Sequence, residues 1–264
     1  KRITAKKILG QHFLMSRPVL SRNAAALPLQ DYDTVIEVGP GPGSLTELLL
    51  ERSKKLVAIE KDRDCIPILN KRFGASQKFS LVEGDVLAHL KNQQLFRGLS
   101  SYAIVANLPY YITGQFLRSV FALKTPPLAM ALLLQKEVAC RICAAPPNMS
   151  MLSLLCQWHS KPRVLFSVKR GLFSPPPGVD SAVVVFRDIQ HREKSLTDAV
   201  FMLAKAGFLH KRKLLKSNVS GFFTSHSKPV EEIFSLCGIS ASCRAQELSL
   251  GEWECIAQHS KKDL

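Results

Sequence analysis

The stretch DTVIEVGPGPGSLTELLLERS, residues 33–53, joins an apolar run to an amphipathic one through three glycines and two prolines. The β-branched residues of its first part favour a buried strand, and the leucines of its second part recur at helical spacing. Ser44, with Glu47 three residues later, has the spacing of a capping box, which predicts Ser44 as the N-cap. Glycines between a strand and a helix let backbone amides approach a ligand. The stretch therefore predicts a strand–helix unit of an α/β sheet with a binding turn at its edge.

The same alternation continues along the chain and indicates a mostly parallel, doubly wound sheet. Further strands are expected at 55–60, 79–85, 102–110, 129–135, 163–173 and 181–188, and helices at 64–73, 114–123 and from 136 onward. The last two strands are expected to pair antiparallel around SPPPGVD. After about residue 188 only helical spacing recurs, at 196–209, 228–238 and 248–260. We therefore expect an α/β domain over residues 1–190 and a small helical domain over 191–264.

The charge of the chain points to an acidic partner. Its 36 Lys and Arg residues outnumber its 21 Asp and Glu residues, which gives a net charge of +15 that repels itself in the folded state. Three basic patches contain no acidic residue: Lys1, Arg2, Lys6, Lys7, Arg17 and Arg22; Lys161, Arg163, Lys169 and Arg170; and Lys205, Lys211, Arg212, Lys213, Lys216 and Lys228. They predict contacts with an RNA backbone.

A membrane is the less favoured partner. The segment HKRKLLKSNVSGFF has no sustained apolar face, and the longest apolar run, residues 128–134, is seven residues long, too short to span a bilayer. The aromatic residues near the third basic patch, Phe208, Phe222 and Phe223, recur at helical spacing and are expected in the core.

The seven cysteines suggest neither a disulfide framework nor a metal site. Their number is odd, their spacing is irregular, and a chain of this length needs no covalent staples. Cys140 and Cys143 form a CxxC within a predicted helix, but no second CxxC or pair of histidines completes a zinc site. We therefore expect reduced, packed thiols in a cytosol-like compartment and no metal.

Two acidic residues follow neighbouring strands of the predicted sheet. Glu60 ends the strand at 55–60, where a carboxylate can accept hydrogen bonds from ribose hydroxyls. Asp85 ends the strand at 79–85, where it can accept a hydrogen bond from the exocyclic amine of an adenine. Because the carboxyl ends of parallel strands meet at one edge, both acids and the glycine turn are expected to outline a nucleoside-binding crevice.

Several motifs in order resemble the rRNA adenine N6-dimethyltransferases of the KsgA type, with the Erm enzymes as cousins. The matching stretches are ILGQHFL (8–14), EVGPGPGSLT (37–46), AIEKD (58–62), GDVL (84–87), NLPYYIT (107–113), QKEVACR (135–141), FSPPPGVDSAVV (173–184), RKLL (212–215) and ELSLGEW (247–253). The resemblance covers nearly the whole chain. It implies a Rossmann-like domain, residues 1–190, that binds S-adenosylmethionine as methyl donor, and an RNA-binding helical domain, residues 191–264.

The resemblance also implies roles for individual residues. The glycines would face the methionine end of the cofactor, Glu60 its ribose and Asp85 its adenine amine, while His12 and Leu14 would close over it. The family commonly has Asn at the position of His12. The positions matched to cofactor binding are His12, Leu14, Gly39, Gly41, Gly43, Glu60, Lys61, Asp85, Val86 and Asn107. Those expected to contact RNA are Lys205, Lys211, Arg212, Lys213 and Lys216.

The segment NLPYYITG, residues 107–114, suits methyl transfer to an adenine amine. The Asn107 carboxamide and the Leu108 carbonyl can each accept one N–H of the amine, which directs its lone pair toward the methyl group. Pro109 sets the turn, and Tyr110 offers a ring on which a flipped-out base stacks. By resemblance, Phe173 presses the other face of that base, whereas alternation places Tyr111 in the core. A neutral Asn suits the site better than Asp, which would hold the cationic sulfonium too tightly.

These observations predict dimethylation of two adjacent adenines near the 3′ end of small-subunit rRNA, in an assembling ribosomal particle. The first alternative is an Erm-like enzyme acting on large-subunit rRNA, and ELSLGEW favours the KsgA type over it. The second is a mainly non-catalytic ribosome-assembly or transcription factor on the same fold. We expect a cytoplasmic monomer, with an organelle matrix as the alternative compartment.

Overall fold

The computed structural model describes residues 5–6, 9–223 and 229–260 of the 264 residues. Lys1, Arg2 and Lys7 of the first basic patch, and Lys228 of the third, lie outside this described part. The chain divides into two compact units, residues 1–140 with 160–190 and residues 141–159 with 191–264.

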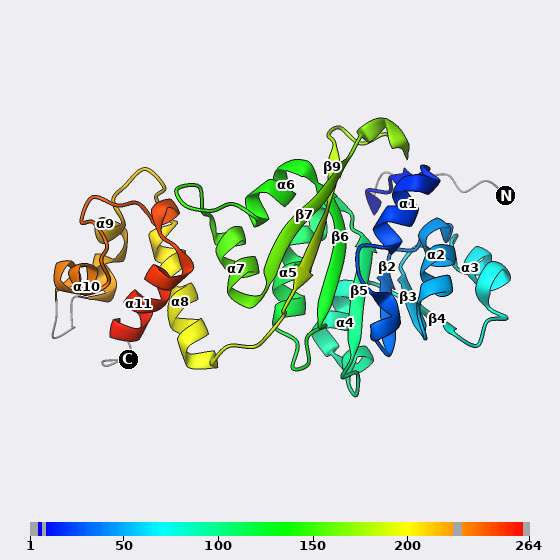
Figure 1. The fold of residues 1–264 in the computed structure, drawn as a ribbon, viewed down its shortest axis with the longest axis horizontal. Helices are drawn as coiled ribbons and strands as arrows, with labels where there is room; N and C mark the ends of the chain where they lie inside the picture. Colours follow the sequence, from blue (N-terminus) through cyan, green and yellow to red (C-terminus); the bar gives the residue numbers. More distant parts are fainter. Residues whose placement is uncertain (1–4, 7–8, 224–228, 261–264) are drawn as a thin grey trace. The chain divides into compact units, whose positions relative to one another are not determined.

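The first unit is built on a seven-stranded sheet with the order β4-β3-β2-β5-β6-β9-β7 (Figure 1). The strands are β2 (Thr34–Val38), β3 (Leu56–Glu60), β4 (Phe79–Glu83), β5 (Tyr102–Asn107), β6 (Ala129–Gln135), β7 (Lys161–Val168) and β9 (Ser181–Arg187). The first five strands of that order run parallel, and β9 runs antiparallel to both β6 and β7. The predicted doubly wound, mostly parallel sheet is therefore confirmed, as is the antiparallel pair.

Helices cover both faces of this sheet, which explains why its central strands are apolar throughout rather than alternating. On one face, α1, α2 and α3 pack against a core that includes Leu49, Leu69 and Val105, each with no exposed surface. On the other face, Phe121 of α5 packs against Phe186 of β9, with ring centroids 6.4 Å apart. The helices of this unit are α1 (Arg17–Ala24), α2 (Ser44–Arg52), α3 (Ile66–Phe73), α4 (Val86–Asn92), α5 (Thr113–Phe121) and α6 (Lys136–Ile142, which crosses the unit boundary).

The second unit is helical and has its own core around Trp158, Val200 and Trp253. Its helices are α7 (Met151–His159), α8 (Lys194–Gly207), α9 (Leu215–Val219), α10 (Val230–Leu236) and α11 (Leu250–Ser260). Ser249 and Glu252, within the ELSLGEW motif, form the capping box that starts α11. Phe223 is buried, and Phe208 and Phe222 pack against the same core, as predicted.

The second unit includes residues 141–159, which the sequence analysis placed in the first domain. The reason is that α7 packs into the helical core: Leu154 is fully buried there, and Trp158 donates a hydrogen bond from Nε1 to Thr197 Oγ1 of α8 at 3.1 Å. Arg192 also lies over the Trp158 ring, 4.2 Å from its centroid.

Two local predictions are wrong. The N-cap of α2 is Gly43, in the left-handed conformation with φ 86°, and not Ser44. Glu47 does not close a capping box but instead accepts a hydrogen bond from Arg72 at 2.8 Å. The left-handed turn is reserved for glycine here, because a Cβ on Gly43 would lie 2.5 Å from the Phe73 ring.

The expectation of seven reduced thiols is also wrong. Cys237, which follows α10, forms a disulfide with Cys255 of α11 across 18 residues of sequence. The irregular spacing concealed the pair, because it arises from the packing of two helices. Cys65, Cys156 and Cys243 are buried, as expected of packed thiols. Within the described residues, no helix has the length and apolar character needed to cross a membrane.

Candidate active site

The carboxyl ends of β2, β3, β4 and β5 meet at one edge of the sheet and surround a pocket. The chain runs outward from β2 through β3 to β4 and then returns to the other side of β2 with β5. In open α/β sheets this reversal opens a crevice for a ligand. The pocket is lined by residues 9–13 of the N-terminal segment and by the strand ends: Val38, Gly39, Gly41, Ile59, Glu60, Lys61, Gly84, Asp85, Val86, Leu87 and residues 107–112.

The glycine turn after β2 brings its backbone directly against this pocket. Gly39 and Gly41 line it, both with positive φ. A Cβ on Gly41 would lie 2.9 Å from Cε1 of Phe13, so only glycine allows the N-terminal segment to lie over the turn. Gly43 caps α2 and does not line the pocket. The turn therefore combines close backbone approach with a packing surface for the segment above it.

Glu60 at the end of β3 is held firmly by backbone amides. Its Oε2 accepts a hydrogen bond from Gly41 N at 2.9 Å, and its Oε1 accepts one from Asp62 N at 2.7 Å. Burial raises the pKa of Glu60 above its ordinary value, although these two hydrogen bonds oppose the rise. Each oxygen keeps a lone pair, so the carboxylate can accept further hydrogen bonds from a pair of vicinal hydroxyls.

Asp85, between β4 and α4, is the N-cap of α4. Its Oδ1 accepts a hydrogen bond from Leu87 N at 2.9 Å, and its Oδ2 pairs with Lys61 Nζ at 2.8 Å. Burial favours a higher pKa for Asp85, but the hydrogen bonds from Lys61 and Leu87 outweigh it, so the pKa is lowered. The carboxylate is therefore ionised, and a ligand amine in the pocket would compete with Lys61 for it.

Asn107 and Leu108 present two acceptors at the end of β5. The Asn107 side-chain nitrogen donates to the carbonyl of His12 at 3.2 Å, which fixes the carboxamide. Among the described residues, nothing donates a hydrogen bond to Asn107 Oδ1 or to the Leu108 carbonyl. Pro109, with φ −55° and ψ 132°, turns the chain into the short helix Tyr110–Ile112. Two residues that line the pocket therefore each have a carbonyl-type oxygen with no donor among the described residues.

Tyr110 is fixed at both ends of its ring. Its hydroxyl shares a hydrogen bond of 2.8 Å with Ser181 Oγ, and its ring stacks with His12 at a centroid distance of 6.0 Å. The His12 Nδ1 in turn lies 2.8 Å from the Pro175 carbonyl. Burial raises the pKa of Tyr110, so its phenol stays neutral over the physiological range.

Most of the predicted catalytic and cofactor-binding residues meet in this one pocket, but three do not. His12, Gly39, Gly41, Glu60, Lys61, Asp85, Val86, Asn107, Leu108, Pro109 and Tyr110 line it. Leu14 and Phe173 face each other in the two-stranded pair β1 (Phe13–Leu14) and β8 (Phe173–Ser174), and both are buried in the core beside the sheet. Gly43 caps α2, as described above.

Tyr111 was predicted to lie in the core, but the structure places it at the pocket. Alternation placed it in the core, yet its side chain is 65% exposed and lines the pocket. The reason is that Tyr111 lies in a helical turn and not in a strand, so the alternation of a strand does not apply. A Cβ on Gly10 would lie 3.3 Å from its ring, which shows how closely the N-terminal segment approaches.

The N-terminal segment is fastened by contacts that were not predicted from the sequence. Asp62, after β3, is 2% exposed, accepts a hydrogen bond from Gln11 Nε2 at 2.7 Å, and pairs with Lys6 Nζ at 2.5 Å. Lys6 N also donates to Gln11 Oε1 at 2.7 Å. Burial favours a higher pKa for Asp62, but these partners outweigh it and lower the pKa. The AIEKD motif could have indicated this role, because Asp62 lies only two residues beyond Glu60.

Glu37 of β2 is a second residue that the sequence analysis left without a role. It is 1% exposed, and its Oε2 has no hydrogen-bond partner among the described residues. Burial raises its pKa to about 8, and the nearby charge of Glu60 adds to the rise. Glu37 is therefore protonated in the folded protein at neutral pH, directly beneath the glycine turn.

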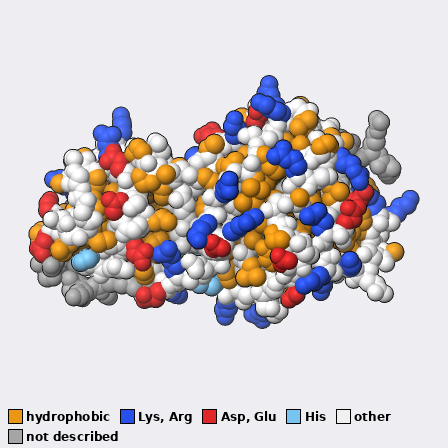
Figure 2. All heavy atoms as spheres, in the orientation of Figure 1, with side chains coloured by type: hydrophobic (Ala, Val, Ile, Leu, Met, Phe, Trp, Pro, Cys, Tyr) orange, Lys and Arg blue, Asp and Glu red, His pale blue; other side chains and the backbone are white. Residues whose placement is uncertain are grey.

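The predicted RNA-binding residues of the helical unit are accessible. Lys205, Lys211, Arg212 and Lys213 are exposed, Lys216 is half-buried, and none forms an ion pair with another described residue. Lys and Arg side chains are spread widely over the face drawn in Figure 2, with hydrophobic side chains exposed between them. These five positions therefore keep their charge available for an anionic partner.

The other two basic patches are partly engaged within the protein. Lys6 pairs with Asp62, Arg17 with Glu47 at 3.6 Å, and Arg22 lies over the Phe166 ring. In the second patch, Lys161 pairs with Asp188 at 2.8 Å and Lys169 with Asp180 at 3.3 Å. Their sequence neighbours are free of acids, but the fold brings acids to them from distant segments.

Comparison with solved structures places this architecture in a known class, the Rossmann-like methyltransferase fold. A dimethyladenosine transferase from Plasmodium falciparum superposes with a TM-score of 0.78 at 23% identity, over 93% of this chain and 96% of that one. The 23S rRNA methyltransferase ErmE superposes with a TM-score of 0.74 at 20% identity, over 94% of this chain and 98% of that one.

Sequence comparison then identifies the family. The model of the ribosomal RNA adenine dimethylase family matches residues 2–259, and the chain belongs to that family. It is 41% identical to a ribosomal RNA small subunit methyltransferase A from Dehalococcoides mccartyi (strain CBDB1), over 96% of this chain and 87% of the relative. The corresponding protein of Prochlorococcus marinus (strain NATL2A) is 38% identical, over 97% of this chain and 91% of the relative.

Proposed function

We propose that this protein dimethylates N6 of two adjacent adenines near the 3′ end of small-subunit rRNA, with S-adenosylmethionine as methyl donor. The observation that carries the proposal is the pair of unengaged acceptors, Asn107 Oδ1 and the Leu108 carbonyl, beside the pocket at the end of β5. Family membership supports the reaction, and the relatives named as small-subunit methyltransferases support the choice of rRNA. The ErmE likeness supports the fold alone.

The residues of the pocket fit the proposed cofactor. Glu60 would accept hydrogen bonds from the ribose hydroxyls, and Asp85 would accept one from the adenine amine in place of Lys61. Gly39 and Gly41 line the pocket with their backbone, so the methionine end would lie against this turn. When bound, S-adenosylmethionine supplies a methyl group whose carbon is electrophilic because it is attached to a sulfonium.

The acceptors then solve the main difficulty of the substrate, whose amine lone pair is delocalised into the purine ring. Asn107 Oδ1 and the Leu108 carbonyl would each accept one N–H of the amine and so direct its lone pair toward the methyl carbon. The hydrogen bond from Asn107 to His12 fixes the acceptor before the base arrives. The Tyr110 ring, held by Ser181, would stack on the flipped-out base.

The experiment supplies labelled S-adenosylmethionine with unmodified small-subunit particles, with large-subunit rRNA, or with neither, and maps N6,N6-dimethyladenosine after nuclease digestion. We expect label in two adjacent adenines of the small-subunit rRNA. Label in large-subunit rRNA alone would instead assign an Erm-like activity. No label in any reaction would favour a factor that acts by binding.

Two variants test the role of the acceptor. Asn107→Ala should abolish label, and Asn107→Asp should bind S-adenosylmethionine at least as tightly but turn over at least about tenfold more slowly, because a carboxylate stabilises the bound sulfonium. Asn92→Ala, at an exposed position at the end of α4, is the matched control and should behave as wild type. Full activity of Asn107→Asp would contradict the proposed role of a neutral acceptor.

The proposal includes a partner and a compartment. The five available basic residues of the helical unit support binding of the RNA backbone, and we propose that the protein acts as a monomer on an assembling small-subunit particle. Its compartment is then one that assembles ribosomes, the cytoplasm or an organelle matrix. Sedimentation of the protein with purified particles tests this partner independently of methyl transfer.

A further inference from the structure

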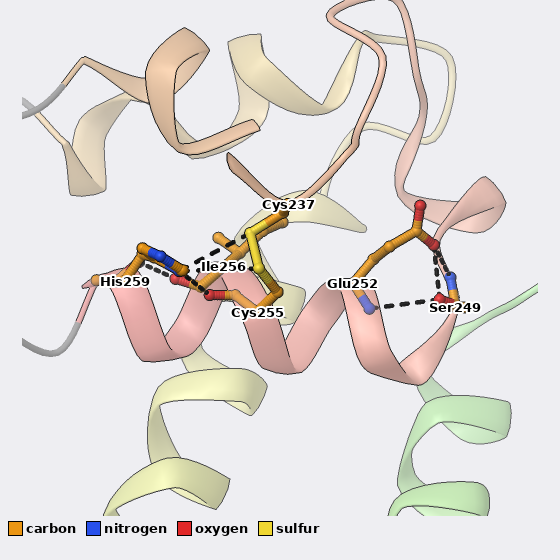
Figure 3. The surroundings of a disulfide bond; sticks show 7 residues. Cys237, Ser249, Glu252, Cys255, Ile256 and His259 are labelled. Carbon is orange, nitrogen blue, oxygen red and sulfur yellow. Dashed lines mark hydrogen bonds between the residues drawn. A yellow bond between two sulfur atoms is a disulfide. The ribbon is translucent and has the colours of Figure 1, made fainter. Parts of the chain in front are cut away.

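Two cysteines and one histidine meet in the helical unit. Cys237 follows the last residue of α10, while Cys255 and His259 lie four residues apart on α11 and therefore on the same face of that helix. Figure 3 shows the His259 ring turned along α11 toward the two sulfur atoms. These three residues can offer their ligand atoms within 4.8 Å of one another. None of the three belongs to the pocket described above.

The distances from the imidazole nitrogen to the two sulfurs are close to those of a zinc site. His259 Nδ1 lies 3.9 Å from Cys237 Sγ and 3.7 Å from Cys255 Sγ. Tetrahedral zinc, with Zn–S of about 2.3 Å and Zn–N of about 2.0 Å, places a sulfur and a nitrogen ligand about 3.5 Å apart. The imidazole therefore lies near enough to both sulfurs to act as a third ligand once reduction lets the two sulfurs separate.

We propose that Cys237, Cys255 and His259 form a zinc-binding site in the reduced protein, and that the disulfide is the closed state of this site. A dithiol reductant opens it: the bond between the two sulfurs breaks, two thiols form, and the reductant becomes a disulfide. On binding zinc, each thiol releases its proton and donates an electron pair from sulfur. His259 binds through Nδ1, with its ring proton on Nε2, and gives up its 2.9 Å contact with the Cys255 carbonyl.

The chemistry of the ligands favours zinc over the hard cations of the cell. Two thiolates and an imidazole select a borderline-soft ion, whereas magnesium and calcium require oxygen ligands. Because His259 is exposed, the fourth position faces solvent and would take a water molecule. In the oxidised protein the imidazole instead contacts the Cys255 carbonyl, so zinc would exchange that contact for a bond to the metal.

The site supports the segment that carries the basic residues. From Cys237 the chain runs through a loop to Cys243, whose carbonyl accepts a hydrogen bond from Leu215 N at 2.8 Å, at the start of α9. Lys213 and Lys216 flank that residue in sequence. Zinc would thus maintain, in the reduced protein, the link between the α10 end and α11 that the disulfide makes in the oxidised protein.

The test uses the full chain, reduced with a phosphine under argon, freed of reductant and titrated with Co²⁺ as a spectroscopic substitute for zinc. We expect one equivalent to bind with the visible bands of tetrahedral cobalt and a thiolate charge-transfer band in the near ultraviolet, and zinc to displace it. Loss of a residue that only supports a metal ligand weakens binding about 10–100-fold. Because His259 would itself be a ligand, His259→Ala should weaken cobalt binding by more than this. Its exposed position on the last turn of α11 keeps this variant folded.

Matched variants locate the binding. Cys237→Ser and Cys255→Ser should lose the charge-transfer band, whereas Cys140→Ser, at an exposed cysteine of the CxxC, and His210→Ala, at an exposed histidine, should keep it. Circular dichroism of each variant checks its folding. Absence of tetrahedral cobalt in the reduced wild type, equal binding by the oxidised protein, or loss of the band only in Cys140→Ser would each overturn the proposal.

Discussion

In the proposed reaction, Tyr110 would serve both packing and recognition. Its hydroxyl is held by Ser181 Oγ at 2.8 Å, and its ring is stacked beside His12, so it is already oriented before any base arrives. Such preorganisation reduces the entropy that binding must overcome. The hydroxyl therefore fixes the position of the ring, which in the proposed reaction would stack on the base.

Replacing Tyr110 with Ala should lower kcat/KM for the RNA substrate by about 5–150-fold, the equivalent of the about 1–3 kcal/mol that stacking on one base contributes. Tyr110→Phe keeps the ring and loses only the hydrogen bond to Ser181, so it should retain most of the activity. Steady-state kinetics on unmodified small-subunit particles distinguishes the two. Equal losses in both variants would show that the hydroxyl, and not the ring, matters.

Glu37 predicts a dependence of stability on pH. Its pKa is about 8 in the folded protein against an ordinary value of 4.5. Between these values the folded state holds a proton that the unfolded state lacks, so the free energy of unfolding falls as pH rises through this window. Glu37→Gln removes the titration and should gain about 2–4 kcal/mol over wild type between pH 5 and pH 8. Denaturant unfolding across that range, with the exposed Glu51→Gln as control, measures the difference.

At the scale of residues, the sequence predicted which side chains line the pocket where a residue follows a strand. Glu60, Asp85 and Asn107 could be placed because the carboxyl ends of parallel strands converge. Tyr111 could not, because its exposure depends on a single helical turn after Pro109. The role of Phe173 stays a prediction from resemblance, since its side chain is 5% exposed and buried beside the sheet.

At the scale of elements, the N-terminal segment is the part of the site most dependent on a few contacts. Residues 9–13 line the pocket, and their position depends on the network of Lys6, Gln11 and Asp62. Short segments without regular structure have few backbone hydrogen bonds of their own, so side-chain anchors determine where they lie. The segment is thus a wall of the pocket that the rest of the unit holds in place.

Asp62→Asn removes one of the two carboxylates that hold Lys6, while Asp64 still pairs with it at 2.6 Å. The change should weaken S-adenosylmethionine binding about 5–30-fold, because hydrogen bonds to a charged group are the stronger kind. The unfolding temperature should change little, since the sheet core does not include this residue. Isothermal titration calorimetry measures the affinity. Asp33→Asn, which breaks the exposed pair with Lys54, is the matched control and should bind as wild type. The same affinity in both variants would contradict a role for the network.

The long periodic elements were predictable, and the short ones were not. Strands β2 to β6 and helices α2, α5, α8 and α11 follow from apolar runs and helical spacing that extend over several turns. The pair β1–β8 is two residues long in each strand and depends on contacts between segments 160 residues apart in sequence. The disulfide depends in the same way on the packing of α10 with α11.

At the scale of the whole molecule, the net charge of +15 should appear as a dependence of RNA affinity on salt. Each phosphate contact adds about 0.7–0.9 to the slope of log affinity against log salt concentration. Replacing Lys211, Arg212 and Lys213 together with Gln should therefore lower that slope by about 2–3. Filter binding across a salt series measures it. The same replacement at Lys54, Lys55 and Lys78, exposed lysines of the first unit, is the control and should leave the slope unchanged.

Because residues 141–159 belong to the helical unit, no single cut in the chain separates the two units. The chain passes between the two units at 140/141, 159/160 and 190/191. A truncation after residue 190 would keep α7 and strip Leu154 and Trp158, which are at most 1% exposed, of the helices that cover them. Recombination between relatives must therefore exchange residues 141–159 and residues 191–264 together, because the two segments share one core.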